Sequence, residues 1–212
     1  MVQLFKRLSL KNALKRNIAW CPDWTINLFH HFSKAFYRFE IFMRGLDKGA
    51  VVKAVDAFDE RINTLGNSIK ERYKIMTVRN MSYLNWRYRD KQYRIFIGEN
   101  GEEVTGYAVA KLENYKDVRV GDIMDNFSRN DKIAPLVAGC LKFFLKQGVD
   151  YVLCGLLRQD PLSMYLKRIG FREHQEIRPI RVVVTPLASE VDTEYLLNQK
   201  NWHLTYGDTD GF

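Results

Sequence analysis

The chain has 212 residues, 46% of them hydrophobic, so it can bury a core of ordinary size and is not disordered as a whole. Its formal net charge is +8. No run of about 18 apolar residues occurs, which argues against a membrane-spanning helix. Three widely spaced cysteines, Cys21, Cys140 and Cys154, argue against a disulfide framework and a cysteine-rich zinc site. We therefore expect a cytoplasmic protein with reduced thiols and no metal.

The positive charge lies mainly in the N-terminal quarter of the chain. Residues 1–49 contain nine Lys or Arg against three Asp or Glu, whereas the rest of the chain contains 24 against 22. A basic segment ahead of a nearly neutral domain favours an anionic membrane surface or an acidic partner. No nucleic-acid-binding motif accompanies it, so we expect no nucleic acid.

The first predicted helix spans residues 24–46. Its apolar residues recur every three or four positions and share one face: Leu28, Phe29, Phe32, Phe36, Phe39, Phe42, Met43 and Leu46. Such a helix packs on the domain or on a second copy of the chain, or it lies at a membrane interface. The adjacent His30 and His31 point about 100° apart on a helix and are poorly placed to share a metal. We expect a basic helical extension, residues 1–48, ahead of a domain that spans 49–212.

The domain begins with helical signals. Residues 51–65 carry their apolar side chains on one stripe, which predicts a helix that ends at Gly66. A short strand up to Val78 and a helix capped by Asn80 are expected next.

From residue 92 the pattern changes to alternating strands and helices. Two β-rich runs around Asn100-Gly101 predict a hairpin, and 118–127 predicts a third strand. Residues 131–149 predict an amphipathic helix. The nearly continuous apolar run 150–157 predicts a strand that is buried on both faces and parallel to a neighbour. Asp160-Pro161 opens another helix, which runs to Gly170. Later strands are expected at 178–187 and 201–206, around a helix at 189–199. The order predicts an α/β domain with a mixed sheet.

Between residues 92 and 185 this order of elements, with the last helix finishing in "RIGF" (168–171), resembles the GNAT acyltransferase fold. The flanking segments "VRNMSYLNWRY" (78–88) and "WHLTYGDTD" (202–210) look like parts of bacterial GNAT-like proteins from polysaccharide and cell-wall gene neighbourhoods. The resemblance implies an α/β (α+β) fold with a mixed, mostly antiparallel sheet flanked by helices. It also implies an acyl-CoA donor in a cleft where two neighbouring strands splay apart. The donor's pyrophosphate would be held by backbone N–H groups at the start of the central helix.

The resemblance places the donor-binding residues before the central helix and after the buried strand. They are Ser128, Arg129, Asn130, Lys132 and Gln159. The glycine-rich phosphate loop of the family is missing, because no glycine occurs between Gly121 and Gly139, and Asp131 adds a negative charge there. The CoA loop is therefore degenerate, and the alternative is that residues 128–132 only cap a structural helix.

The resemblance also implies a proton donor on the last helix. The family's tyrosine stands five residues before the Phe of "GF", near the thioester sulfur, where it protonates the departing thiolate. In this chain Leu166 occupies that position and Tyr165 stands six residues before Phe171. We take Tyr165 as the candidate acid, with a structural tyrosine as the alternative. Asp122 and Asp125 on the third strand are candidate bases, although a regular strand would point them to opposite faces unless a bulge intervenes.

These features predict a transferase that moves an acetyl or other acyl group directly from acyl-CoA to the amine of a sugar or amino-acid-derived acceptor. One alternative is a non-catalytic GNAT-like module that binds a partner chain, a ligand or an anionic membrane. Another is the acceptor-binding half of a two-part transferase. In either alternative, residues 24–46 would provide an assembly surface, in a homo-oligomer or with a partner protein, or a peripheral membrane contact.

Overall fold

The computed structural model describes residues 1–9, 22–44, 51–69, 73–115, 118–129, 133–174, 184–185 and 192–209. The strand expected at 178–187 lies outside these ranges except for residues 184–185, and Cys21, Asn130 and Lys132 also lie outside them.

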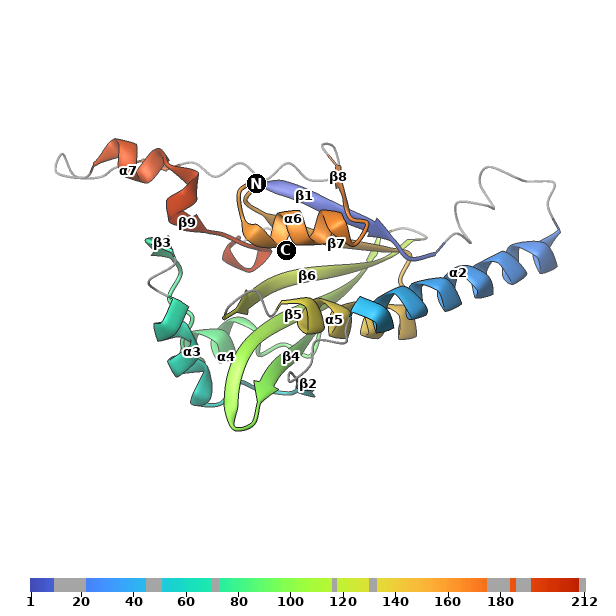
Figure 1. The fold of residues 1–212 in the computed structure, drawn as a ribbon, viewed down its shortest axis with the longest axis horizontal. Coiled ribbons are helices and arrows are strands. Elements are labelled where there is room, and N and C mark those ends of the chain that lie inside the picture. The colour runs from blue at the N-terminus through green and yellow to red at the C-terminus, as the bar shows by residue number, and fades with distance from the viewer. Residues whose placement is uncertain are drawn as a thin grey trace.

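A seven-stranded sheet forms the centre of the molecule (Figure 1). Its strands are β1 (Val2–Arg7), β2 (Val51–Val55), β4 (Tyr93–Asn100), β5 (Glu103–Tyr115), β6 (Val118–Ser128), β7 (Tyr151–Leu156) and β8 (Arg172–His174). Their order across the sheet is β2-β4-β5-β6-β7-β1-β8. Every neighbouring pair is antiparallel except β6 and β7, which are parallel. The predicted mixed, mostly antiparallel sheet is confirmed.

The central strands follow the sequence pattern closely. Strands β4 and β5 form the predicted hairpin, and Gly101 in its turn has φ of 61°, a conformation that favours a residue without a Cβ. Strand β7 is almost entirely buried and parallel to β6, as its apolar run predicted.

Helices cover both faces of the sheet. One face packs against α5 (Ala134–Lys146) and α6 (Pro161–Arg168), and the other packs against α3 (Arg61–Ile69) and α4 (Met81–Arg87). The alternation of side chains along β5 divides the core accordingly: Ala108 and Ala110 face α5, whereas Tyr107 and Val109 face α3 and α4. Asn80 caps α4 as predicted, because its side chain accepts a hydrogen bond from the Tyr83 amide at 2.8 Å.

The N-terminal part of the chain differs from expectation at its start. Residues 2–7 form strand β1, which lies between β7 and β8 and buries Leu4 completely, so a helical extension is wrong for these residues. The predicted helix that follows is confirmed as α2 (Asp23–Arg44), which packs along α5 (Figure 1). Within the described part of the chain, none of the helices combines the length and apolarity needed to cross a bilayer. The expected boundary near residue 48 lies outside the described residues.

The helix predicted at 51–65 is also partly wrong. Residues 51–55 form strand β2 at the sheet edge, paired with β4, and the helix α3 begins only at Arg61 and continues through Gly66. Val51, Val52 and Val55 fit a helical stripe, but β-branched side chains also favour strands, and the exposed edge of β4 provides a pairing partner.

The C-terminal segment returns to the centre of the fold. It contains α7 (Thr193–Leu197), a 3-10 helix η1 (Gln199–Asn201), strand β9 (Trp202–His203) and a second 3-10 helix η2 (Tyr206–Asp208). Strand β9 pairs in parallel with the short β3 (Ile75–Met76), and Thr205 bridges to Leu156 at the end of β7. The aromatic ring of Tyr206 is fully buried, so this segment is part of the core.

Candidate functional site

The two parallel strands of the sheet separate along their length. Pairing joins Val120–Ile123 of β6 to Tyr151–Cys154 of β7 and extends no further. Beyond this point β6 continues to Ser128 against β5, while β7 continues to Leu156, which contacts the C-terminal segment. A bulge in β6, where Met124 has no partner in the ladder with β5, marks the point of separation.

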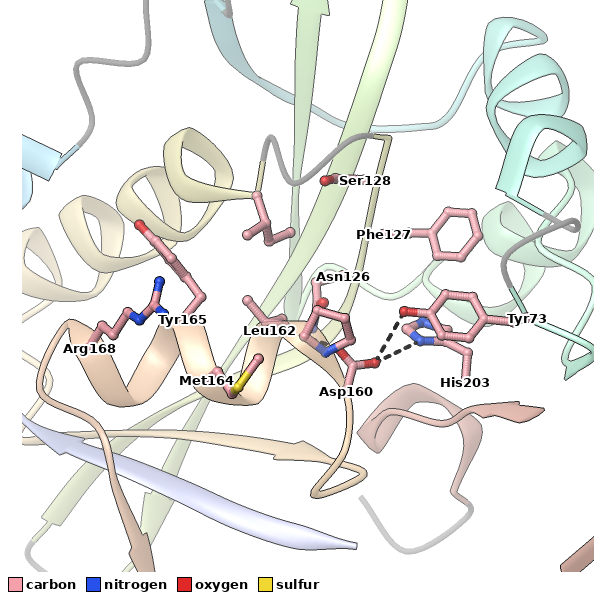
Figure 2. Close-up of a pocket in the computed structure, with 12 residues that line it drawn as sticks. Tyr73, Asn126, Phe127, Ser128, Asp160, Leu162, Met164, Tyr165, Arg168 and His203 are labelled. Carbon is pink, nitrogen blue, oxygen red and sulfur yellow. Dashed lines mark hydrogen bonds and ion pairs between the residues drawn. The ribbon is translucent and has the colours of Figure 1, made fainter. Parts of the chain in front are cut away.

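A cavity of about 240 Å³ lies where the strands have separated. Its walls come from the end of β6, the residue before α5, helix α6 with its cap, and two aromatic residues from β9 and the segment before β3. Figure 2 shows Tyr165 and Arg168 of α6 at one end of the cavity, and Tyr73 and His203 at the other. The sheet separation thus creates an opening bordered by groups from distant parts of the chain.

An aspartate and a histidine meet in this cavity. The Asp160 carboxylate caps α6 by accepting a hydrogen bond from the Leu162 amide at 2.9 Å, and its other oxygen lies 3.2 Å from His203 Nδ1 (Figure 2). The Tyr73 hydroxyl lies 3.5 Å from the same oxygen. The imidazole ring of His203 packs between the rings of Tyr73 and Phe127, with centroids 4.6 and 5.4 Å away. Both members of the pair are buried, so the imidazole is held in one orientation.

Two buried polar atoms on the cavity-lining residues lack a hydrogen-bond partner within the described residues. They are Nε2 of His203 and Nδ2 of Asn126. Buried polar groups in proteins are nearly always hydrogen-bonded, because burying one without a partner costs about 1–3 kcal/mol.

The sequence-predicted tyrosine lies at this site. Leu166, at the family's tyrosine position, is completely buried in the core, whereas Tyr165 is half-buried and lines the cavity. The shift by one residue therefore leaves a tyrosine on the cavity side of α6.

The two candidate bases lie elsewhere. The bulge at Met124 offsets the odd spacing of Asp122 and Asp125, so both share the sheet face of their partners Lys111 and Val109, which α3 and α4 cover. Both carboxylates are buried, and neither residue lines the cavity.

Asp125 is the centre of a buried polar network. It accepts hydrogen bonds from the hydroxyls of Tyr107, Tyr88 and Thr205 at 3.0, 3.1 and 3.1 Å, and Arg79 Nε lies 3.3 Å away. Burial alone would raise the pKa of Asp125, but the Arg79 guanidinium, the His203 imidazole and the hydrogen bond from Tyr107 together outweigh burial and hold that pKa below its usual value.

The network extends into the C-terminal segment. Arg79 Nη2 donates to Asp208 at 2.7 Å, and Asp208 accepts the Thr205 amide at 2.8 Å. Burial, reinforced by the negative charge of Asp125, raises the pKa of the Tyr88 and Tyr107 hydroxyls well above the usual value. These hydroxyls therefore remain protonated donors, and the network ties α4, β5 and β6 to the C-terminal segment.

Of the predicted donor-binding residues that the structure describes, one lines the cavity and two do not. Ser128 lines the cavity. Arg129 instead pairs with Glu103 and donates to Ser68 Oγ at 3.1 Å, and Gln159 is exposed outside the cavity lining. Asn130 and Lys132 lie outside the described residues.

Arg168 is a cation that sequence reasoning missed. It lines the cavity and forms no ion pair within the described residues.

Sequence reasoning also missed Asp160, His203 and Asn126 as site residues. Asp160 was predicted only as a helix start, and His203 only as part of a strand. Asp160 and His203 are 43 residues apart in the sequence, and the parallel pairing of β9 with β3 contributes to bringing His203 to the cavity. No local pattern singles out Asn126, which stands between Asp125 and Phe127 in β6. No cluster of three or more His, Cys, Asp or Glu suited to a metal occurs within the ranges that the structure describes.

Comparisons with known proteins found similar structures but no significant match by sequence. No protein-family model matches the sequence, and no curated protein is significantly similar to it. One similar solved structure is an aminoglycoside acetyltransferase from an uncultured soil metagenomic sample in complex with trehalose; it is 12% identical, covers 68% of this chain and 98% of its own, and has a TM-score of 0.46.

Two further similar structures come from named bacteria. A protein from Thermus thermophilus is 21% identical over 65% of this chain and 98% of its own, with a TM-score of 0.42. A predicted acetyltransferase with acetyl-CoA from Clostridium acetobutylicum is 13% identical over 62% of this chain and 96% of its own, with a TM-score of 0.45.

The order and pairing of the helices and strands identify the fold. The antiparallel hairpin β4–β5, the long β6, the central helix α5, the buried parallel β7 and the helix α6 occur in the predicted order, and β6 and β7 separate as expected. The architecture confirms the resemblance of this chain to the GNAT acyltransferase fold.

Proposed function

We propose that the protein is an acyltransferase that moves an acyl group from acyl-CoA to an amine. The observation that carries this proposal is the cavity at the separation of β6 and β7, with the unpartnered Nε2 of His203 and Nδ2 of Asn126 on its lining residues. Acyl transfer to an amine needs an acceptor for the amine proton and a donor for the carbonyl oxygen, and these two atoms have those properties.

The cavity would hold the reacting end of the donor. Its volume of about 240 Å³ is below the roughly 300–1,000 Å³ of pockets that enclose a whole drug-sized ligand. The phosphates would therefore lie outside it, near Arg168 and the first turn of α5. Within the described residues no side chain caps α5 there, so the amides of Ala134 and Leu136 would serve as donors for an anion, while Pro135 has none.

The proposed reaction is a direct transfer. The amine nitrogen attacks the thioester carbonyl carbon, so that a C–N bond forms and the C–S bond breaks. His203 Nε2 accepts the amine proton, and Asp160 stabilises the resulting imidazolium from the Nδ1 side. Asn126 Nδ2 donates to the carbonyl oxygen as negative charge develops on it. Tyr165 is the proposed proton donor to the CoA thiolate.

A second cavity supports a hydroxyl-bearing amine as the acceptor. It has a volume of about 550 Å³ and shares Tyr73 with the first. Polar side chains on its walls are Asn63, Asn67, Tyr73, Lys74, Arg79, Asn80 and Ser82. Asn63 and Asn80 use their carbonyl oxygens to accept backbone amides at 2.8 Å, so their NH₂ groups are the donors that a ligand would meet. This chemistry suits a sugar amine, with an amino-acid-derived amine as the second choice.

Donor binding tests the proposal first. Calorimetry with acetyl-CoA and the purified chain should detect binding, and Arg168→Ala should weaken it at least about tenfold through loss of one charge-assisted phosphate contact. Arg94→Ala, at a partly exposed arginine on β4 that pairs with exposed Asp56, is the matched control and should bind as the wild type does. Absence of binding at millimolar acetyl-CoA or a longer acyl-CoA would contradict the proposal.

Turnover tests the assignment of the base. His203→Gln should retain donor affinity and lower kcat about 100-fold or more, the range expected for loss of a positioned proton acceptor. His31→Gln, at an exposed histidine of α2, is the control. Thermal unfolding of each variant separates a chemical effect from loss of folding. A fully active, folded His203→Gln enzyme would exclude this residue, and an active Tyr165→Phe enzyme would exclude Tyr165.

The absence of glycine between Gly121 and Gly139 favours a second function, a non-catalytic module of the same fold. Donor binding without turnover across amine acceptors would support that alternative.

A further inference from the structure

Helix α2 exposes a continuous aromatic stripe. The solvent-exposed fractions of these residues are 68% for Trp24, 48% for Leu28, 60% for Phe29, 67% for Phe32, 64% for Phe36 and 63% for Phe39. Positions 24, 28, 32, 36 and 39 follow one another at three- and four-residue steps, so the stripe runs along one side of the helix. Single exposed apolar residues are ordinary, but a contiguous stripe of this kind marks an interaction surface.

The stripe is separate from the face that fixes α2 to the domain. Ile26 is buried, and Tyr37 packs against the core beneath α5. Lys6 of β1 donates to Glu40 at 2.9 Å and to the carbonyl oxygen of Ile169 after α6. These contacts attach one side of α2 to the sheet and to α6 while the aromatic side remains uncovered by the described residues. Figure 1 shows that the N-terminal half of α2 extends beyond the sheet.

Among the described residues, positive charge lies in the groove beside Tyr37 and Glu40 of α2. The carboxylate of Glu40 is already paired with Lys6, so it offers little repulsion to an anion. The groove beside Tyr37 and Glu40 is lined by Arg7 and Arg172, and neither forms an ion pair within the part of the chain that the structure describes. Residues 1–49 carry nine basic against three acidic residues, a surplus of six.

We infer that α2 binds the surface of an anionic lipid bilayer. The aromatic stripe would enter the headgroup boundary with the helix lying in the plane of the membrane, and the basic segment would contact lipid phosphates. Trp and Phe are the residues that such interfacial helices use on their apolar face. The 22 residues of α2 would cover a length of about 33 Å at about 1.5 Å per residue. The excess positive charge favours lipid over a second copy of the chain, because two equally basic segments repel each other.

Vesicle flotation with the full chain tests the inference. At about 0.1 M salt the protein should float with vesicles of phosphatidylcholine containing about a third phosphatidylserine, and at least tenfold less should float with pure phosphatidylcholine or at about 1 M salt, where charges are screened. The double variant Phe32→Ser/Phe36→Ser should lose at least tenfold in bound fraction. Trp86→Ser, at a residue equally exposed on α4, is the matched control and should float as the wild type does.

The alternative occupants give different results. Equal flotation by the double variant and the wild type would overturn the inference. A dimer in analytical ultracentrifugation that the double variant dissociates, without flotation by the wild type, would assign the stripe to a second copy. Neither result depends on acyl-CoA binding, so the inference can fail while the proposed function holds.

Discussion

Asp125 shows how burial changes the role that a residue type suggests. A carboxylate on the strand that faces the acyl group in GNAT proteins was a reasonable candidate base. Its oxygens are instead occupied by three hydroxyls and Arg79, and the residue does not line the cavity. A base must reach its substrate, whereas a carboxylate surrounded by donors holds a structure together. We assign the network of Arg79, Asp125 and Asp208 to stability.

Acid should therefore weaken the fold through Asp125. Its folded-state pKa lies below the unfolded value of 3.8, so its stabilising contribution is present above that value and is lost as the pH falls through the folded pKa. Urea unfolding at several pH values below about 5 should show a falling free energy of unfolding. Asp125→Asn should be about 3–5 kcal/mol less stable at pH 7, because it leaves buried Arg79 with one partner fewer, and its acid dependence should be shallower.

The control for this prediction is Asp56→Asn, since the Asp56 side chain is 99% exposed and its pair with Arg94 lies at the surface. It should change the free energy of unfolding by less than about 0.5 kcal/mol. An Asp125→Asn protein as stable as the wild type, with the same acid dependence, would show that the network does not support the fold.

At the scale of elements, strand β7 and the C-terminal 3-10 helix η2 pack closely because the residue of β7 at the contact, Gly155, has no side chain. A Cβ added at Gly155 would lie 1.9 Å from the ring of Tyr206, so only glycine leaves room for that ring. Gly155→Ala should destabilise the protein by about 1–3 kcal/mol or more through overpacking, measured by urea unfolding. Gly98→Ala, where the nearest atom would be a Thr105 hydroxyl at 3.2 Å, should cost less. Equal losses in the two variants would contradict this account of the fit.

Elements with a single consistent pattern could be predicted from the sequence. The hairpin around Gly101, the buried β7 and the proline-initiated α6 each combined a periodicity with a specific start or turn residue. The prediction for strand β2 was wrong because its valines fit a helix or a strand equally well. The prediction for β1 was wrong because its partners lie about 150 residues further along the chain. Pairing with a distant partner leaves no local signal.

The candidate site was predictable only in part for the same reason. Tyr165 and Ser128 belong to elements with clear patterns, and both line the cavity. The Asp160–His203 pair depends on the return of the C-terminal segment to the sheet. The C-terminal segment returns to the sheet through tertiary contacts, among them the burial of Tyr206. The spacing of apolar residues along the sequence gives no information on such contacts.

At the scale of the whole molecule, the C-terminal segment completes both the core and the cavity. Deleting residues 201–212 would remove His203 from the site, Tyr206 from the core and Asp208 from Arg79. Loss of a large buried aromatic side chain alone costs about 3–5 kcal/mol, comparable with the total stability of many domains. The truncated protein should show no cooperative thermal transition by circular dichroism. Leu197→Ser, at a 66% exposed position in α7, is the control and should unfold cooperatively. A truncated protein that unfolds like the full chain would contradict this view.

The position of β1 has a consequence for synthesis of the protein. Among the strands of the central sheet, β1 is made first, yet it pairs with Tyr151–Leu156 and Arg172–His174, which are made last. Strand β1 must therefore stay unpaired until residues 151–174 have emerged, and the central sheet can close only then. A chaperone that shields β1 until then would thus act on the step that completes this fold.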